Sequence, residues 1–235
     1  MVSTRFSFWV LDVIRDRLSL ANICALRLSS IGHLVDMADL QFQGQLYIAM
    51  CRMLRNPSNP GCLTYNIGHS LVDFGPGDHA LVSGLKMTGS KQLPASSQFH
   101  ATVFKGVKKL SFSDIQKRFL KECDRSRGNS ELCLRLALLC ILYGVVMAKD
   151  RSTRCLDLGY MHLMDDMDKF NEYRWGRVTY DELLLRTFSA KACINGYEGK
   201  DSKLRIEARG FVFVLQAWAY EVIPELASFC AKSSI

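Results

Sequence analysis

The chain has 235 residues, of which 49% are hydrophobic, 23% charged and 10% aromatic, values typical of a folded globular protein. This composition excludes a disordered tail, and the length is ample for a core that needs no disulfide or metal to stabilise it. The 30 Lys and Arg against 23 Asp and Glu give a formal charge of +7. Such an excess permits binding to nucleic acid or to an acidic partner but establishes neither, because net charge governs association rather than fold.

Three features of the sequence bear on the compartment. No small-residue cleavage site follows the short apolar stretch Phe6–Leu11, so a signal peptide is not expected. The longest apolar run, Leu136–Ala148, has 13 residues, whereas a membrane span needs about 20. The nine cysteines include no CxxC pair, and the five histidines are scattered. We therefore expect an intracellular chain with reduced, buried thiols, Cys24 among them, no membrane partner, no metal and no other cofactor.

The first 61 residues predict three helices. Over residues 8–40 the apolar residues recur at helical spacing, with a break near Gly32 that divides the segment into two short helices. A third helix is expected over Phe42–Leu54. The segment Asn56–Gly61 ends it, because its two prolines and its glycine cannot continue a helical hydrogen-bond ladder.

A β-hairpin and a short helix are expected next. The β-prone runs Cys62–Ile67 and Ser70–Phe74 are separated by a glycine-containing turn, a pattern typical of a hairpin. Pro76 and Asp78 then mark the first turn of a helix, and Gly84 marks its end. These signals predict a small sheet followed by a helix of about two turns.

Residues 86–110 are an irregular basic excursion, rich in Ser, Thr, Gly and Lys, in which a short strand is expected near Thr102–Phe104. The segment Ser113–Gln116 has capping-box spacing and predicts a helix that runs to about Cys123. The excursion is expected to lie on the surface of the domain rather than to mark a boundary.

The last part of the chain contains two apolar helices. Asn129 or Ser130 caps the nearly all-apolar helix Leu132–Met147, which is expected in the centre of the domain. Thr179–Glu182 opens a further helix, and the apolar segment Gly210–Val222 forms the last one. The sequence as a whole predicts a mainly α fold with a small β-hairpin, that is, a helix-rich α+β single domain over residues 1–235.

Three segments, taken in their order along the chain, resemble blocks of a known plant family. They are Val72–Leu85, Asp168–Val178 and Gly210–Pro224. The residues that match the family's pattern are Phe74, Gly84, Phe170, Asn171, Trp175, Gly176, Arg177, Trp218, Glu221 and Pro224. Their order and spacing are more specific than any one block.

The chain is similar, over about residues 20–231, to the plant domain of unknown function that commonly precedes a ubiquitin-like-specific (SUMO) protease domain in transposon-derived proteins. More distantly, it is similar to the plant mobile domain. The resemblance implies a helix-rich fold, a nuclear location and a noncatalytic role in protein interaction or scaffolding. The implied partner is a SUMO-protease-like protein or domain. The family supplies no catalytic residue, and the oligomeric state is not predicted.

A cysteine protease is the first enzymatic alternative, because His162, Asp181 and Cys193 occur in the order of a catalytic triad. A SUMO protease would also carry Trp after the histidine, Gln shortly before the cysteine and Gly after it. Here Leu163 and Ile194 occupy two of these places, and the glutamine is missing. We therefore expect no enzymatic activity and no role for Cys193 in catalysis.

A metal site at the acidic cluster is the second alternative. The cluster consists of Asp165, Asp166, Asp168 and Glu172. A calcium loop starting at Asp166 would need an oxygen ligand where Phe170 stands and glycine where Asn171 stands, so the pattern fails. The chain also has no glycine-rich phosphate loop of either common pattern.

Positive charge gathers between residues 86 and 118. The basic residues there are Lys86, Lys91, Lys105, Lys108, Lys109, Lys117 and Arg118, against the single acid Asp114. With Phe99, His100 and Phe104 interleaved, this stretch could bind nucleic-acid phosphates with little base specificity. Nucleic-acid binding is therefore the alternative function, and a solvated loop of lysines is the competing interpretation.

Overall fold

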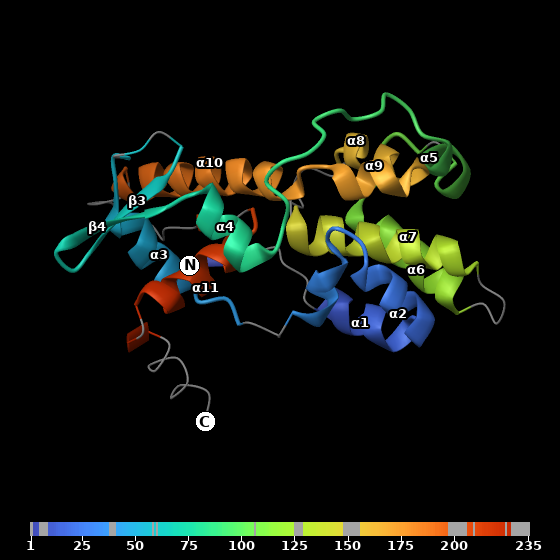
Figure 1. Ribbon diagram of the computed structural model, residues 1–235, viewed down its shortest axis with the longest axis horizontal. Coiled ribbons are helices and arrows are strands. Elements are labelled where there is room, and N and C mark those ends of the chain that lie inside the picture. Colours follow the sequence, from blue (N-terminus) through green and yellow to red (C-terminus); the bar gives the residue numbers. More distant parts are fainter. Residues whose placement is uncertain are drawn as a thin grey trace. The chain divides into compact units, whose positions relative to one another are not determined.

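The computed structural model is mainly helical with a small antiparallel sheet, which confirms the predicted fold class (Figure 1). It describes residues 2–4, 9–37, 41–57, 59, 61–105, 107–124, 129–147, 156–196, 206–208, 210–223 and 225–226. The chain divides into two compact units. Unit 1 is Met1–Thr4, Leu40–Leu85 and Gly176–Ile235, and unit 2 is Arg5–Asp39 and Lys86–Trp175. Because of this division, the expected single domain over residues 1–235 stays a prediction.

The sheet of unit 1 contains the predicted hairpin. Strands β3 (Leu63–Ile67) and β4 (Ser70–Phe74) are antiparallel, and Leu63 pairs with Phe74. A third strand, β2 (Leu54–Arg55), pairs with the other edge of β3. A separate parallel pair joins β1 (Val2–Thr4) to β5 (Ile206–Ala208), which the sequence did not predict because the two strands are about two hundred residues apart.

The helices of unit 1 follow the sequence signals except at one start. The structure has α3 over Gly44–Met53, α4 over Pro76–Ser83, α10 over Trp175–Asn195 and α11 over Val212–Val222. The start of α10 at Trp175 corrects the prediction of a cap at Thr179. The Thr179 hydroxyl donates a hydrogen bond to the Gly176 carbonyl at 3.0 Å within the helix, so it does not cap it.

The core of unit 1 is aromatic. The ring of Phe74 lies 5.2 Å from that of Trp218 and 5.9 Å from that of Tyr180, centroid to centroid. The buried Tyr180 hydroxyl reaches two carbonyl oxygens, of Gly61 at 2.6 Å and of Phe74 at 3.1 Å. These hydrogen bonds connect α10 to both ends of the hairpin, and they satisfy a polar group that burial would otherwise penalise.

Unit 2 is built around one apolar helix. The predicted central helix is α7 (Ser130–Ile141), continued by a single π-helical turn, η2 (Leu142–Val146). From Leu136 to Met147 every residue is buried, as expected. It packs beside α6 (Phe112–Cys123) and contacts α1 (Trp9–Arg17) and α2 (Leu20–Arg27) (Figure 1).

The residues that cap α6 and α7 in unit 2 differ in part from those that the sequence predicted. The box that opens α6 is Ser111 with Asp114, two residues before the expected Ser113. The Asp114 carboxylate accepts hydrogen bonds from both the amide and the hydroxyl of Ser111, at 2.9 and 2.6 Å. Of the two residues proposed to cap α7, the structure selects Asn129, whose side chain accepts from the Leu132 amide at 3.1 Å.

Two further predictions in the first part of unit 2 are corrected. The break in residues 8–40 falls at Leu18-Ser19, and Gly32 instead opens a 3₁₀ turn, η1 (Gly32–Asp36). Cys24 was expected to be buried but is exposed, because Ile23 and Leu26 form the buried face of α2.

Between α7 and α10, the described residues 156–174 form three short helices. They are α8 (Leu158–Met161), η3 (His162–Asp165) and α9 (Met167–Glu172). The end of α9 contacts the start of the basic excursion. The Ser90 amide donates to the Glu172 carbonyl at 3.0 Å, and the Arg174 amide donates to the Ser90 carbonyl at 3.4 Å. The excursion is therefore connected to α9 by backbone hydrogen bonds.

Substitution of Gly89 should disturb this connection. Gly89 has a φ of +135°, and a Cβ built there would lie 2.1 Å from the Glu172 carbonyl oxygen. We expect Gly89→Ala to lower the free energy of unfolding by about 2 kcal/mol, measured by urea denaturation followed by circular dichroism. Gly77→Ala is the control, since no atom lies within 4 Å of the added Cβ. Equal losses in the two variants would contradict this account of Gly89.

Candidate functional site

The basic residues between 86 and 118 all lie in unit 2, but the structure uses them differently. Arg118 pairs with the buried carboxylate of Glu122 at 3.4 Å. The Lys86 ammonium donates to the Asn171 carbonyl at 3.3 Å. Lys117 lies close enough to Asp114 to help lower the pKa of that carboxyl, after the larger effect of the hydrogen bonds from Ser111. These three side chains are thus partly engaged within unit 2.

The remaining lysines of the stretch are unpaired. Lys91, Lys105, Lys108 and Lys109 are exposed, and none forms an ion pair with any residue that the structure describes. Three of them, Lys105, Lys108 and Lys109, fall within five residues of chain and are called the lysine cluster below. Because no carboxylate neutralises them, they carry the positive charge that solvent or a ligand meets.

The loop that carries the lysine cluster is anchored at both ends. Phe104 and Leu110 are buried on either side of it, with exposed fractions of 7% and 2%. The Leu110 carbonyl accepts from the Leu156 amide at 2.9 Å, and one ring nitrogen of His100 lies 3.0 Å from the Val107 carbonyl oxygen. The ends of the loop are therefore fixed on unit 2 while Lys105, Lys108 and Lys109 are exposed, which differs from a freely solvated lysine loop.

A helix precedes this loop, so the strand predicted near Thr102–Phe104 is wrong. Residues Gln98–Val103 form α5 instead. Asp165 explains the difference, because its carboxylate accepts from the backbone amides of Gln98 and Phe99 at 2.9 and 2.7 Å. A carboxylate at that position satisfies the free donors of the first turn and complements the helix dipole.

Several carboxylates of unit 2 likewise form ion pairs or hydrogen bonds within the unit. Asp36 holds Arg27 through two hydrogen bonds of 2.8 Å, and Asp124 pairs with Arg17. Asp166 accepts from the backbone amides of Asp168 and Lys169 at the start of α9. These carboxylates therefore already have cations or backbone amides as partners.

Sequence reasoning did not single out two further cations of unit 2 as functional candidates. Lys121 lies one turn after Lys117 on α6, is exposed, and pairs with no acid in the described ranges. The spacing of four residues on a predicted helix was a usable signal for it. The second is Arg135, which lines an open hollow of about 430 Å³ together with Gln98, Phe99, Thr102 and Asp165. Its guanidinium pairs with Glu131 at 2.5 Å. The hollow is formed by residues from three separate segments of the chain, so no local sequence pattern reveals it.

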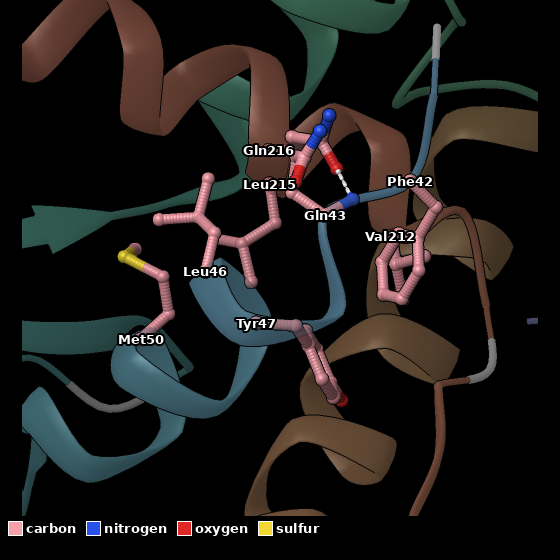
Figure 2. Close-up of a pocket in the computed structure, with 8 residues that line it drawn as sticks. All are labelled: Phe42, Gln43, Leu46, Tyr47, Met50, Val212, Leu215 and Gln216. Atoms are coloured by element: carbon pink, nitrogen blue, oxygen red, sulfur yellow. Dashed lines mark hydrogen bonds between the residues drawn. The ribbon is translucent and has the colours of Figure 1, made fainter. Parts of the chain in front are cut away.

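A second cavity, in unit 1, is too small for an organic ligand. Its lining consists of Phe42, Gln43, Leu46, Tyr47, Met50, Val212, Leu215 and Gln216 (Figure 2). Its volume of about 10 Å³ has room for about one water molecule. The Gln216 amide is already satisfied, because its oxygen accepts from the Gln43 amide at 2.9 Å and its nitrogen donates to the Gln41 carbonyl at 3.0 Å. The cavity is therefore a packing gap between α3 and α11.

Two of the three residues in triad order are bonded to other groups. A ring nitrogen of His162 lies 2.8 Å from the Pro94 carbonyl oxygen, and the Asp181 carboxylate accepts from Arg177 at 3.0 Å. Asp181 and Cys193 lie twelve residues apart on α10, or about 18 Å along a helix axis. The structure therefore does not bring this aspartate and cysteine together.

Two residues of the acidic cluster 165–172 bind the backbone amides at helix starts. Asp165 caps α5, and Asp166 caps α9 and pairs with Lys169 at 3.0 Å. Among the residues that the structure describes, no three metal-ligating side chains gather at one place. No helix within those ranges is long and apolar enough to span a membrane.

Trp175 is the largest fully buried residue among those that carry the family resemblance. Its side chain is 0% exposed, and its indole N–H donates to the Phe170 carbonyl at 2.8 Å. The rings of Tyr173 and Phe170 lie 4.7 and 5.0 Å from it, centroid to centroid. Asn171 connects α9 to the turn after α2, because its side-chain oxygen accepts from the Ser30 amide at 2.9 Å.

The other motif residues lie in unit 1. Phe74 and Trp218 are buried against each other, and Gly84 ends α4. Gly176 is buried in the first turn of α10, where Arg177 forms its ion pair with Asp181. Glu221 is exposed on α11, and Pro224 lies outside the described residues.

His79 is a buried titratable group in unit 1. It is 0% exposed, and its two ring nitrogens lie 3.4 Å from the hydroxyl oxygens of Ser83 and Thr179. Burial lowers the pKa of His79 to about 4, so the ring is neutral at pH 7. With Phe74 and Tyr180 against its ring, this histidine belongs to the core.

The family follows from a comparison of the whole sequence. The model of a domain of unknown function, DUF1985, matches residues 55–186, which is more than half of the chain. The chain belongs to the DUF1985 family. The match contains the first two resembling segments and the whole basic stretch, whereas Gly210–Pro224 lies beyond it. No curated protein and no solved structure matches the chain.

Proposed function

We propose that this DUF1985 chain is a noncatalytic binding module that holds the phosphates of nucleic acid on the lysine cluster. The carrying observation is that Lys105, Lys108 and Lys109 are exposed on an anchored loop and form no ion pair with any residue that the structure describes, while several other carboxylates of unit 2 are engaged elsewhere. Ammonium groups on a surface bind phosphates mainly by releasing condensed counterions, which gives affinity with little sequence preference. Lys91, Lys117 and Lys121 would extend the contact.

The noncatalytic part of the proposal is supported by the partners of the triad-order residues. His162 is bonded to a backbone carbonyl, and Asp181 is bonded to Arg177. A triad requires the imidazole to accept a proton from the thiol and to donate to the carboxylate, so these partners oppose that use.

The proposal is tested with a variant that removes the three cluster charges. We expect Lys105→Gln, Lys108→Gln and Lys109→Gln together to weaken binding of the purified chain to duplex DNA at least tenfold at 50 mM salt, equally for two unrelated sequences. The assay is fluorescence anisotropy of a labelled duplex.

A matched variant controls for net charge. Arg17→Gln, Arg27→Gln and Lys169→Gln remove three cations of unit 2 that the structure pairs with carboxylates. We expect this variant to retain most of the affinity. Equal weakening by the two variants would show that total charge, not the lysine cluster, controls binding.

Scaffolding is the second candidate function, and one surface of α2 favours it. Leu20, Cys24 and Leu28 follow one another at four-residue spacing and are all exposed, with exposed fractions of 78% for Leu20 and 88% for Leu28. Residues at this spacing share one helix face, so α2 and its C-cap residue Leu28 present an outward apolar stripe. We propose that its partner is a SUMO-protease-like domain of a nuclear, plant transposon-derived protein, as the family resemblance implies.

The scaffolding candidate is tested with such a protease domain in purified form. Leu20→Lys with Leu28→Lys should weaken the complex at least tenfold by isothermal titration calorimetry. Leu81→Lys, on α4, changes a leucine of comparable exposure (86%) in unit 1 and should leave the affinity unchanged. Lack of binding by the unaltered chain would exclude this partner.

A further inference from the structure

Cys123 and Cys133 lie opposite each other on neighbouring helices of unit 2. Cys123 is the last residue of α6, and Cys133 lies in the first turns of α7. Phe112, at the start of α6, packs on Gly144, just beyond α7, so the two helices are antiparallel. The same register places Cys123 directly opposite Cys133.

The side chains between these two ends agree with this register. Counting inward from Phe112 and Gly144 places Ile115 opposite Ile141 and Phe119 opposite Ala137, and all four of these residues are at most 1% exposed. One further helical turn, from Phe119 along α6 and from Ala137 along α7, leads to Cys123 and Cys133. Cys133 lies close enough to Cys123 to contribute to the raised pKa of the Cys123 thiol, after the larger effect of burial.

The two thiols differ in access to solvent. Cys123 is partly exposed, whereas Cys133 is buried, with an exposed fraction of 6%. This arrangement suits a dithiol in which an external reagent reaches one sulfur and the second sulfur completes the reaction. We propose that Cys123 and Cys133 are a modification site, which a low-molecular-weight disulfide such as glutathione disulfide converts reversibly into an intramolecular disulfide.

The reaction balances as two thiol–disulfide exchanges. The Cys123 thiolate attacks one sulfur of glutathione disulfide, the S–S bond of that molecule breaks, and one glutathione leaves. The Cys133 thiolate then attacks the Cys123 sulfur, the mixed disulfide breaks, and the second glutathione leaves. The protein thiols lose two electrons and two protons, and glutathione disulfide is reduced to two thiols.

The product would connect the last turn of α6 to the first turns of α7. The disulfide would close a loop of 11 residues. A cross-link around a loop of this size lowers the conformational entropy of the unfolded chain, which reduces the equilibrium constant for unfolding about a hundredfold. By linkage, the disulfide must form about a hundredfold more favourably in the folded chain than in the unfolded chain. The site would therefore couple the redox state to the stability of unit 2.

The experiment measures this ratio in the full chain. Protein is equilibrated with glutathione and glutathione disulfide at several ratios, in buffer and in 8 M urea (about the concentration that unfolds most domains). It is then acid-quenched, alkylated and mapped by mass spectrometry. Because burial, followed by the Cys133 contact, raises the pKa of Cys123 to about 12, its thiolate is scarce and the mixtures are held until they stop changing.

We expect a cross-linked peptide joining Cys123 to Cys133, with an equilibrium constant about a hundredfold higher in buffer than in urea. If the equilibrium constant in buffer is equal to or lower than that in urea, the proposal is overturned. A cross-link from Cys123 to Cys140 would also overturn it. Cys24→Ser removes an exposed thiol of α2 and should leave the cross-link unchanged. Cys133→Ser should abolish it, and the comparison of buffer with urea decides the outcome even if that variant fails to fold.

Discussion

Replacing Trp175 with alanine is expected to lower the free energy of unfolding by about 4 kcal/mol. The side chain is completely buried, and three aromatic rings surround it, those of Phe170, Tyr173 and Tyr160 at 5.0, 4.7 and 5.7 Å between centroids. Alanine would leave a large cavity there. It would also remove the donor to the Phe170 carbonyl, a buried acceptor that then loses this hydrogen bond.

The measurement is urea denaturation followed by far-ultraviolet circular dichroism, since loss of a tryptophan changes the fluorescence itself. Trp9→Ala is the control, because Trp9 is 51% exposed at the start of α1. We expect that variant to lose less than about 1 kcal/mol. A loss below 1 kcal/mol for Trp175→Ala would show that the aromatic cluster around α9 contributes little to the stability of unit 2.

The stability of the chain is expected to fall by about 3 kcal/mol between pH 6.5 and pH 4 because of His79 alone. Its ordinary pKa is 6.5, and burial lowers the pKa to about 4 in the folded chain. Between these two values the unfolded chain binds a proton that the folded chain does not, so acidification favours unfolding. Above pH 6.5 both forms are neutral, and below pH 4 both are charged, so the loss is confined to that window.

The test compares the unaltered chain with His79→Gln at half-unit steps of pH. Glutamine retains hydrogen-bonding groups for Ser83 and Thr179 but does not titrate. The difference between the two free energies of unfolding should change by about 3 kcal/mol across the window. Because the carboxylates titrate in both proteins, their contribution cancels. A difference independent of pH would mean that His79 is not buried in its neutral form.

Local sequence signals predicted the parts of unit 1 that local interactions control. The hairpin of β3 and β4 was predicted to within one residue of its observed bounds, because the strands, the turn and the pairing all lie within Leu63–Phe74. The helix α4 was predicted from Pro76, Asp78 and Gly84, and the structure shows Asp78 accepting from the Gly75 amide at 2.8 Å. Such signals need no partner from elsewhere in the chain.

Distant partners account for two of the failures. Thr102 and Val103 are β-branched and favoured a strand, but the carboxylate of Asp165, more than sixty residues later, stabilises a helix there. The pairing of β1 with β5 likewise joins segments that no local pattern connects.

The candidate surface was predicted in position but not in detail. The count of basic residues between 86 and 118 located the positive charge in the sequence. Whether each basic side chain is paired or exposed depends on its neighbours in the folded chain. The pair of Arg118 with Glu122 has four-residue helical spacing and was readable from the sequence. The contact of Lys86 with Asn171 required the folded chain, and so did the anchoring of the loop by Phe104 and Leu110.

The salt dependence of DNA binding tests most directly the claim that the lysine cluster contacts phosphates. The logarithm of the association constant is measured against the logarithm of the salt concentration for the unaltered chain and for the variant with Lys105→Gln, Lys108→Gln and Lys109→Gln. We predict a slope that is smaller in magnitude by about 2.7 in the variant, since each lost phosphate contact removes about 0.9. An unchanged slope would contradict the proposed function, because it would place the phosphate contacts elsewhere on the chain.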